Sequence, residues 1–467
     1  MTAVAAVRRP LPTSRSPFAP LRARPYRIYL SGQALASIGS WMQGIAQDWL
    51  VLQLTHSSTA VGLVLALQFL PMLLFGLHGG LLADRFPKKR ILLVTQSINT
   101  SFALLLATLT LTGTIQVGYV YAMALVGGFV FAVDAPTRQS FVTEVVGPDI
   151  LRGAVSLNAA VFQATRLVGP ALAGVLIGTV GTGWVFAANA ACCIGPTIGL
   201  LLLRPEDLTP APARPREPKA LRSAARYVLA RPHVFWTIVL AGVVGTFGLN
   251  FPIVVSAFAT RTFGGDAGTY ATFNVALAIG SMSGALVAGS LRTTRLRVIV
   301  AAGVAFGLVQ ALAALAPSVP AYFAALVVLG VASMGFQAMA NSSVQLWVDA
   351  EFRGRVMGLY MLVFIGGTTV GSPIVGEITN SFGPRVGMAF CGLVPAVVAL
   401  AVGLRHLAGA RGGSASPRPG RMERCRPSRR APAATLARVT SWADRSRTGR
   451  PAWRGRPRAS FASRGRR

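Results

Sequence analysis

Long apolar runs, separated by short charged or glycine- and proline-containing turns, occupy the chain from residue 26 to residue 406. A run of about 18 or more apolar residues is long enough to cross a bilayer as a helix. The pattern predicts an all-α integral membrane protein with twelve transmembrane helices. The expected spans are 26–52, 59–83, 90–112, 116–137, 153–179, 183–203, 233–260, 268–291, 297–316, 319–341, 355–379 and 384–406.

Composition supports a membrane protein and argues against nucleic-acid binding. The 467 residues are 53% hydrophobic and 13% charged, whereas a soluble domain carries roughly 25% charged residues. The net charge of +31 is concentrated, because 17 arginines lie in residues 407–467. We expect 407–467 to be a disordered cytoplasmic tail, serving either as a spacer or as a contact with anionic lipid.

A Pro- and Arg-rich segment at 204–232 divides the spans into six and six. We therefore predict a leader at 1–24, bundles at 25–203 and 233–406, and a cytoplasmic linker at 204–232. Within the linker, 220–229 has the spacing of an amphipathic helix, lying either on the membrane surface or in solvent. Arg152 and Arg355, like Pro170 and Pro373, are 203 residues apart, so the two halves are expected to be pseudo-symmetric repeats.

Loop charges predict the orientation of the chain. Cytoplasmic loops of membrane proteins carry an excess of Lys and Arg. The turns after even-numbered runs are rich in both residues, whereas the opposite turns hold only Arg261 and Arg385. We therefore expect a multi-pass protein of the cell membrane with both termini in the cytoplasm.

The chain contains no GxxxxGK phosphate loop, and its histidines and cysteines lack metal-ligand spacing. We therefore expect neither an enzyme nor a cofactor, and any work on a substrate would draw on a gradient. The expected partners are a small-molecule substrate, protons and the lipid bilayer, with no nucleic acid and a monomeric state.

Ionisable residues inside the spans are costly and mark candidate functional positions. Arg166 lies deepest and would hold either an anionic group or an acidic side chain of a neighbouring helix. Asp48 and Glu377 lie near the outer ends of their spans, where the alternatives are a gate or a solvated mouth on one hand and proton coupling on the other. Asp134 would carry a proton or pair with Arg138, one helical turn away.

A polar stripe on the first span adds candidates for the lining of a cavity. Gln43 and Gln47 precede Asp48 at helical spacing, in positions where contact with lipid would be unfavourable. A structural network between helices is the alternative.

Several stretches resemble a known family. The segment from Gly80 to Lys89, with Asp84 and Arg85 at its centre, resembles the loop 2–3 signature of the major facilitator superfamily, with Pro87 in place of the usual glycine. Residues 39–51, 166–174 with Asn158, and 353–357 resemble the branch of efflux proteins similar to enterobactin exporters and macrolide efflux pumps.

The resemblance implies two six-helix bundles that rock about a central site and expel amphipathic drug-like or siderophore-like molecules, by proton antiport. A narrow siderophore or metabolite exporter and a non-transporting sensor or scaffold with a basic tail are the alternatives. The resemblance also assigns residues. The conformational latch would be Gly80, Asp84, Arg85, Lys88, Lys89, Arg138 and Arg355. The charged and polar positions inside the spans, taken with Asn158 from the resembling stretches, give the candidate substrate or proton pathway: Gln43, Gln47, Asp48, Asp134, Asn158, Arg166 and Glu377. An antiporter-like element of the fifth span would be Gly169, Pro170 and Gly174.

Overall fold

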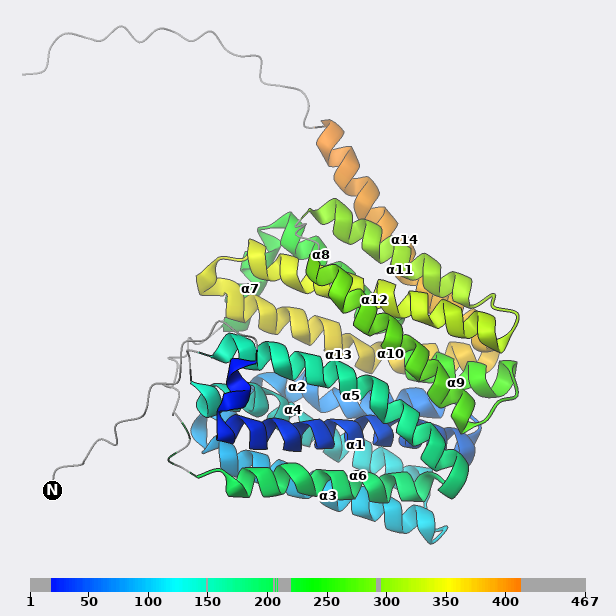
Figure 1. Ribbon diagram of the computed structural model, residues 1–467. Helices are drawn as coiled ribbons and strands as arrows, with labels where there is room; N and C mark the ends of the chain where they lie inside the picture. Colours follow the sequence, from blue (N-terminus) through cyan, green and yellow to red (C-terminus); the bar gives the residue numbers. More distant parts are fainter. Residues whose placement is uncertain are drawn as a thin grey trace, which may run out of the picture. The chain divides into compact units, whose positions relative to one another are not determined.

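The computed structural model describes residues 18–147, 150–204, 206, 208, 220–290 and 295–412, and these ranges are helical without a strand (Figure 1). The predicted all-α class is confirmed. The predicted leader and tail lie mostly outside the described residues. The long helices of the first half are α1 (Arg24–Thr55), α2 (Ser58–Arg85), α3 (Lys88–Leu111), α4 (Val117–Val146), α5 (Leu151–Val180) and α6 (Thr182–Leu202).

The second half begins with a membrane-length segment made of four pieces, α8 (Pro232–Val243), η3 (Val244–Gly248), α9 (Phe251–Ala257) and η4 (Phe258–Thr262). The sequence predicted one continuous helix here, but η3 and η4 are π-helical turns. The remaining long helices are α10 (Ala267–Ser290), α11 (Leu296–Ala313), α12 (Val319–Trp347), α13 (Ala350–Phe382) and α14 (Pro384–Gly412).

Eleven of the described helical segments are long and apolar enough to cross a membrane. Of the long described helices, α1 is the one outside this set, because its polar stripe lowers its hydropathy. It is nevertheless 32 residues long and packs along α5 and α6, so it is the twelfth long helix of the fold.

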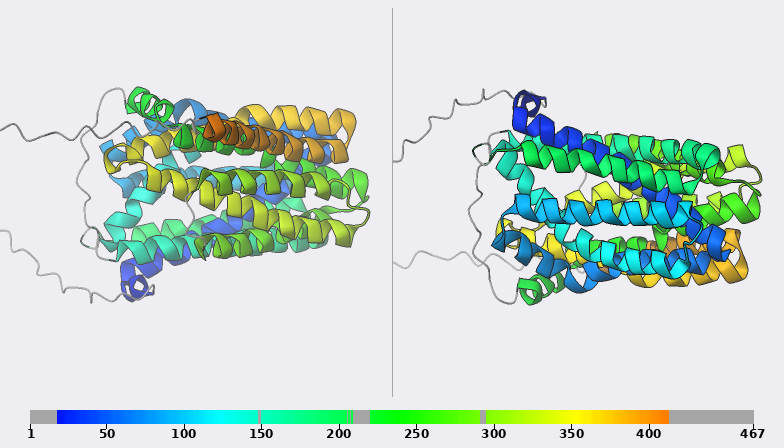
Figure 2. Two further views of the ribbon diagram at one scale, coloured as in Figure 1. Left: turned by 90° about the horizontal axis from the view of Figure 1, so that it is seen from above. Right: turned by 90° about the horizontal axis from the view of Figure 1, so that it is seen from below.

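The helices form two halves, α1–α6 and α8–α14, whose members run side by side (Figure 2). Helix α2 packs on α13 and helix α5 packs on α10 across the boundary between the halves. We call the end where Lys88 and Lys89 begin α3 the basic end, and the end with the His56 turn between α1 and α2 the distal end.

Small residues bring neighbouring helices into close contact. A Cβ added to Gly280 of α10 would lie 2.0 Å from the carbonyl oxygen of Val327 in α12. The reciprocal position, Gly330 of α12, faces the Leu277 carbonyl at 2.5 Å in the same way. Close backbone approach of this kind supplies the packing energy that the hydrophobic effect does not supply within lipid.

The predicted linker helix exists but packs on protein. Helix α7 (Ala220–Leu229) buries Ala224 and Val228 and contacts α8 and α13. Tyr227 stacks on Phe352 with ring centroids 4.6 Å apart. These contacts cover part of its apolar face, and its place at the membrane surface or in solvent stays a prediction.

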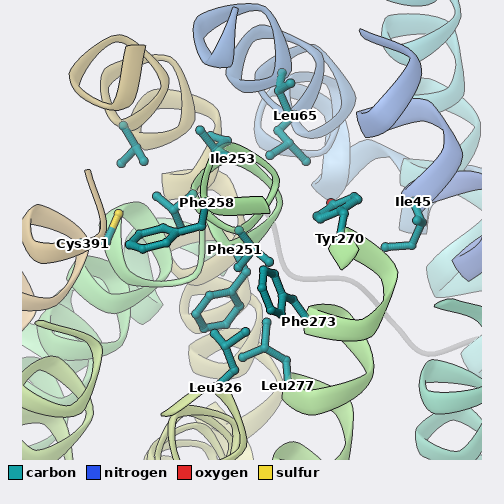
Figure 3. Packing of buried hydrophobic residues seen from close by; sticks show 14 of the residues in the cluster. Ile45, Leu65, Phe251, Ile253, Phe258, Tyr270, Phe273, Leu277, Leu326 and Cys391 are labelled. Atoms are coloured by element: carbon teal, nitrogen blue, oxygen red, sulfur yellow. The ribbon is translucent and has the colours of Figure 1, made fainter. Parts of the chain in front are cut away.

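The hydrophobic core is continuous between the halves toward the distal end and divided at the basic end. One large cluster joins Ile45 of α1 and Leu65 of α2 to Ile253, Tyr270 and Phe273 of the second half (Figure 3). A second cluster holds only first-half residues. A third cluster belongs to the second half and α7. Among the described side chains, the apolar packing shared by the two halves therefore lies toward the distal end.

Candidate functional site

The boundary between the halves is tight at the distal end. A Cβ on Gly62 of α2 would lie 2.4 Å from the carbonyl oxygen of Ser372 in α13. A Cβ on Gly376 would lie 2.9 Å from the carbonyl oxygen of Ser58. Toward the middle of the same pair of helices, Gly366 faces the side chain of Leu73. Glycine therefore permits a backbone contact between α2 and α13, because any side chain at these positions would push the two helices apart.

Asp48 forms a buried hydrogen bond across this boundary. The hydroxyl of Tyr270, on α10, donates to Asp48 Oδ2 over 3.0 Å. Asp48 is 7% exposed and Tyr270 is fully buried. The indole of the adjacent Trp49 stacks on the Tyr270 ring, with centroids 6.3 Å apart. The predicted gate-or-proton residue therefore joins α1 to the second half.

Two further polar contacts cross the boundary at the distal end. The Thr59 hydroxyl donates to Glu377 Oε2 over 3.0 Å, which places Glu377 in an exposed contact between α2 and α13. Arg261 of η4 donates to the His56 carbonyl at 2.9 Å. His56 ends α1 with a φ of 51°, so the second half binds the carbonyl of a left-handed turn in the first half.

One face of α1 is open near the middle of the helix. Ser40, Gly44 and Asp48 recur every four residues and so share a face of the helix. Asp48 reaches the second half, whereas Ser40 is exposed and a Cβ on Gly44 would meet no atom within 4 Å. This face therefore contacts the second half at Asp48 and is exposed nearer the middle of α1.

Arg166 lies beside this face, midway along α5. Its guanidinium carbon is 5.6 Å from the centroid of the Trp41 ring on α1. Trp41 also packs against Phe162 at 5.6 Å. The acidic neighbour that was one reading of Arg166 is not present among the described side chains.

Other predicted pathway residues bind within the first half. Asn189 of α6 donates to the side-chain oxygen of Gln43, and the Tyr26 hydroxyl donates to Asn158 Oδ1 at 3.2 Å. These contacts join α1 to α6 and α5, which is the structural-network alternative. Gln47 is partly buried on α1.

Asp134 and Arg138 form an ion pair inside α4. The predicted fourth span ended at 137, but α4 continues to Val146. The pair is satisfied by neighbouring helices: Thr95 donates to Asp134 over 2.6 Å, and Arg138 donates to Gln96 over 2.8 Å and to Gln33. Both residues therefore lie inside the helix rather than near its end. Their burial is tolerated because each charge has a partner.

Three of the predicted latch residues make described contacts within their own halves. Lys88 pairs with Glu144 of α4, and Lys89 donates to the Leu203 carbonyl at 2.6 Å. Arg355 of α13 lies over the ring of Phe352 at 5.3 Å. Gly80, Asp84 and Arg85 belong to the last turns of α2, and their side chains lie outside the described residues. The latch stays a prediction.

The predicted element of the fifth span positions α5 between the halves. Gly169 allows α1 to approach, since a Cβ there would lie 2.4 Å from the Trp41 Cβ. Gly174 faces Ala271 of α10 at 2.4 Å in the same way. Pro170 is buried between them. From Gly169 to Gly174, α5 thus packs against α1 of its own half and α10 of the other half.

A cavity of about 560 Å³ lies elsewhere, in the second half at the basic end, and is not part of the boundary. It is lined by His233, Arg295, Leu296, Arg297, Trp347 and His406. No group of three or more metal-ligating side chains occurs among the described residues.

Sequence reasoning did not single out as site residues Tyr270, Thr59 and Arg261 at the boundary, or Trp41 beside Arg166. Tyr270 lies 222 residues from Asp48, and no pattern links the two. Arg261 did give a signal, because it is one of the rare cations on its side of the predicted membrane.

The chain matches a family model described as transmembrane secretion effector over residues 15–414. It is 24% identical over 380 residues to the enterobactin exporter EntS of Salmonella choleraesuis (strain SC-B67), covering 80% of this chain and 90% of that protein. It is 29% identical over 167 residues to the staphyloferrin A transporter of Staphylococcus aureus (strain NCTC 8325 / PS 47), covering 36% of this chain and 42% of that protein.

Solved structures share the fold at low identity. A bacterial homolog of the human lysosomal transporter Spinster, in an inward-facing and unoccupied conformation, matches with a TM-score of 0.62 at 14% identity. The match covers 84% of this chain and 96% of that one. A POT family transporter in complex with a thioalcohol-conjugated peptide matches with a TM-score of 0.65 at 10% identity.

Proposed function

The chain belongs to the transmembrane secretion effector family of major facilitator transporters, and from that premise we propose that it exports a small amphipathic molecule by alternating access. A membrane transporter of this superfamily is established by the family match, and the direction and substrate are our proposal. The names of the two relatives, an enterobactin exporter and a staphyloferrin A transporter, favour a siderophore-like substrate.

One observation carries the mechanism: the apolar core is shared between the halves toward the distal end and divided at the basic end. Alternating access needs two arrangements in which the halves touch at one end and then at the other. We infer from the described core that this arrangement is the one open at the basic end. The cations of that end favour the cytoplasm, so this arrangement would receive a substrate from inside the cell.

We propose that closing the basic end uses the latch assigned from the family signature. Asp84 would approach the first turn of α13, where the positive end of the helix dipole attracts an anion. Lys88 and Lys89 would remain within the first half, as their contacts with Glu144 and Leu203 indicate.

We propose that Asp48 couples transport to protons. The Tyr270 hydroxyl donates to its carboxylate across the boundary, so the protonation of Asp48 bears directly on a contact between the halves. Opening the distal end would separate the two side chains and give Asp48 access to protons from outside. Proton entry would then accompany release of the substrate.

The test measures uptake of radiolabelled compounds into everted membrane vesicles that contain the full chain. The compounds are a catecholate siderophore, a carboxylate siderophore and a cationic drug. Uptake of at least one compound, lost on adding a proton uncoupler, is the expected result. Absence of uptake for the whole panel in vesicles that hold folded protein would contradict the proposal. Uptake that persists with the uncoupler would contradict proton antiport alone.

The scaffold alternative is separated by truncation. Deleting residues 413–467 leaves α14 intact, so an exporter should keep its uptake rate, whereas a scaffold acting through its basic tail would lose its function.

A further inference from the structure

Arg166 is a cation at the middle of a membrane helix, and no acidic side chain of the described residues pairs with it. It lies midway along the 30-residue α5. The ion pairs among the described side chains do not include Arg166. The hydrogen bonds among the described residues do not have Arg166 as a donor either. A charged side chain at this depth is costly unless it meets an opposite charge or water.

The acids of the first half whose side chains are described are already engaged. Asp48 accepts from Tyr270, Asp134 pairs with Arg138, and Glu144 pairs with Lys88. Within this set, no carboxylate is left to neutralise Arg166.

An aromatic platform holds the guanidinium in place. The Trp41 ring lies 5.6 Å from the guanidinium carbon, and Gly169 lets the two helices close to that distance. Phe162, one turn before Arg166, packs on Trp41 with an interplanar angle of 58°. Stacking offsets part of the desolvation cost, but the N–H donors in the guanidinium plane have no acceptor among the side chains and carbonyls that the structure describes.

The platform adjoins the open face of α1. Ser40, next to Trp41 in sequence, is exposed, and Gly44 is one turn further along with no atom within 4 Å of an added Cβ. Phe162 is 50% exposed. A ligand between the halves would therefore reach the donors of Arg166 from the side of this opening.

We propose that Arg166, positioned by Trp41, binds the planar oxyanion of an organic acid midway through the membrane. The guanidinium fork matches a carboxylate or a pair of phenolate oxygens through two parallel hydrogen bonds. The inference rests on the proposed export function, because it names the substrate class of the same pathway. It also excludes simple cations as preferred substrates, since an uncompensated positive charge repels them.

The experiment measures equilibrium binding to the purified full chain in nanodiscs. The probes are citrate, salicylate and salicylamide, the last being a neutral analogue of salicylate. The variants are Arg166→Gln and Arg166→Lys, with Arg152→Gln as the matched control. Arg152 lies on the same helix, at its basic end, and is exposed.

We expect at least one of the two anions to bind the native chain, and salicylamide to bind roughly 10-fold more weakly than salicylate wherever salicylate binds. Arg166→Gln should weaken anion binding by roughly 10- to 100-fold, the usual effect of losing hydrogen bonds to a charged group. Arg166→Lys should retain part of the binding, because it keeps the charge and loses the fork. Arg152→Gln should bind like the native chain. Binding of salicylate alone would identify an aromatic acid, and binding of citrate would extend the site to aliphatic acids.

Three results would overturn the site: neither anion binds the native chain, Arg166→Gln binds them equally well, or salicylamide binds as tightly as salicylate. If Arg166→Gln does not fold, anion binding by Arg166→Lys is compared with that of the native chain instead. Anion binding that depends on Arg166 in a chain that transports nothing would refute the export proposal and leave the site standing. Siderophore uptake at the native rate by Arg166→Gln would refute the site and leave the exporter.

Discussion

Replacing Gly62 by Ala should shift the chain away from the arrangement described here. Gly62 is buried in α2 at the distal boundary, and the added Cβ would lie 2.4 Å from the carbonyl oxygen of Ser372. Real Cβ contacts do not fall below 3.0 Å, and the obstructing atom belongs to a helical backbone. The substitution therefore forces α2 and α13 apart.

The size of the effect follows from the cost of overpacking. Inserting a methyl group into a close-packed contact costs about 1–3 kcal/mol. Because the contact exists only while the distal end is closed, this cost applies to one of the two arrangements, and it changes their ratio by roughly 5- to 150-fold. The helix itself is not weakened, since Ala has a higher helix propensity than Gly.

The assay is sided labelling of a cysteine at position 40, where Ser40 is exposed on the open face of α1. A membrane-impermeant maleimide is added to intact cells or to everted vesicles, in a chain whose native cysteines are replaced at Cys192, Cys193, Cys391 and Cys425. The parent chain should label faster from the basic side. Gly62→Ala should slow that reaction and speed labelling from the distal side.

Gly178→Ala is the matched control, because it is the same change toward the distal end of α5, where an added Cβ meets no atom within 4 Å. It should label like the parent. A folded Gly62→Ala chain with an unchanged ratio of labelling from the two sides would refute the reasoning.

Three further changes test separate contacts. Tyr270→Phe removes the donor to Asp48 and should shift the sided labelling in the same direction as Gly62→Ala, by roughly 10- to 100-fold; an unchanged ratio would show that this bond does not hold the distal end. Asp84→Asn should insert and fold but lose vesicle uptake, and full uptake would remove Asp84 from the latch. Asp266→Ala removes hydrogen bonds to Thr269 in the first turn of α10 and should lower the thermal unfolding temperature in detergent at neutral pH, at a cost of about 1 kcal/mol. The Thr269 donors lower the pKa of Asp266, so its contribution should be lost as the pH falls below about 4, and a deficit that is equal at pH 7 and pH 3 would contradict this explanation.

The helices were predictable because lipid imposes a simple requirement: a segment that crosses it must be long, apolar and helical. Predicted and observed spans accordingly agree closely at α3, α6 and α11. The end of α4 was predicted too early, because Asp134 and Arg138 look like a boundary until their partners on other helices are known.

The site was predictable only as single residues. The cost of burying charge singled out Asp48 and Arg166, but their surroundings depend on contacts between distant segments. Tyr270 and Trp41 are ordinary aromatic residues of membrane spans, and only the packing of α1 against α5 and α10 gives them a role. The glycines of the distal boundary are similarly indistinguishable in sequence from glycines that face open space.

The central claim, that transport requires the distal end to open, is tested most directly by holding that end closed. Cysteines replacing Thr59 and Glu377, whose side chains meet across the boundary, are joined by a reducible thiosulfonate cross-linker in the cysteine-free chain. The matched control joins positions 316 and 385 within the second half, where Arg385 donates to the Ala316 carbonyl. Export is then measured before and after reduction. We predict that the cross-link at 59 and 377 abolishes export, that reduction restores it, and that the control cross-link has no effect. Undiminished export by the chain cross-linked at 59 and 377 would contradict alternating access.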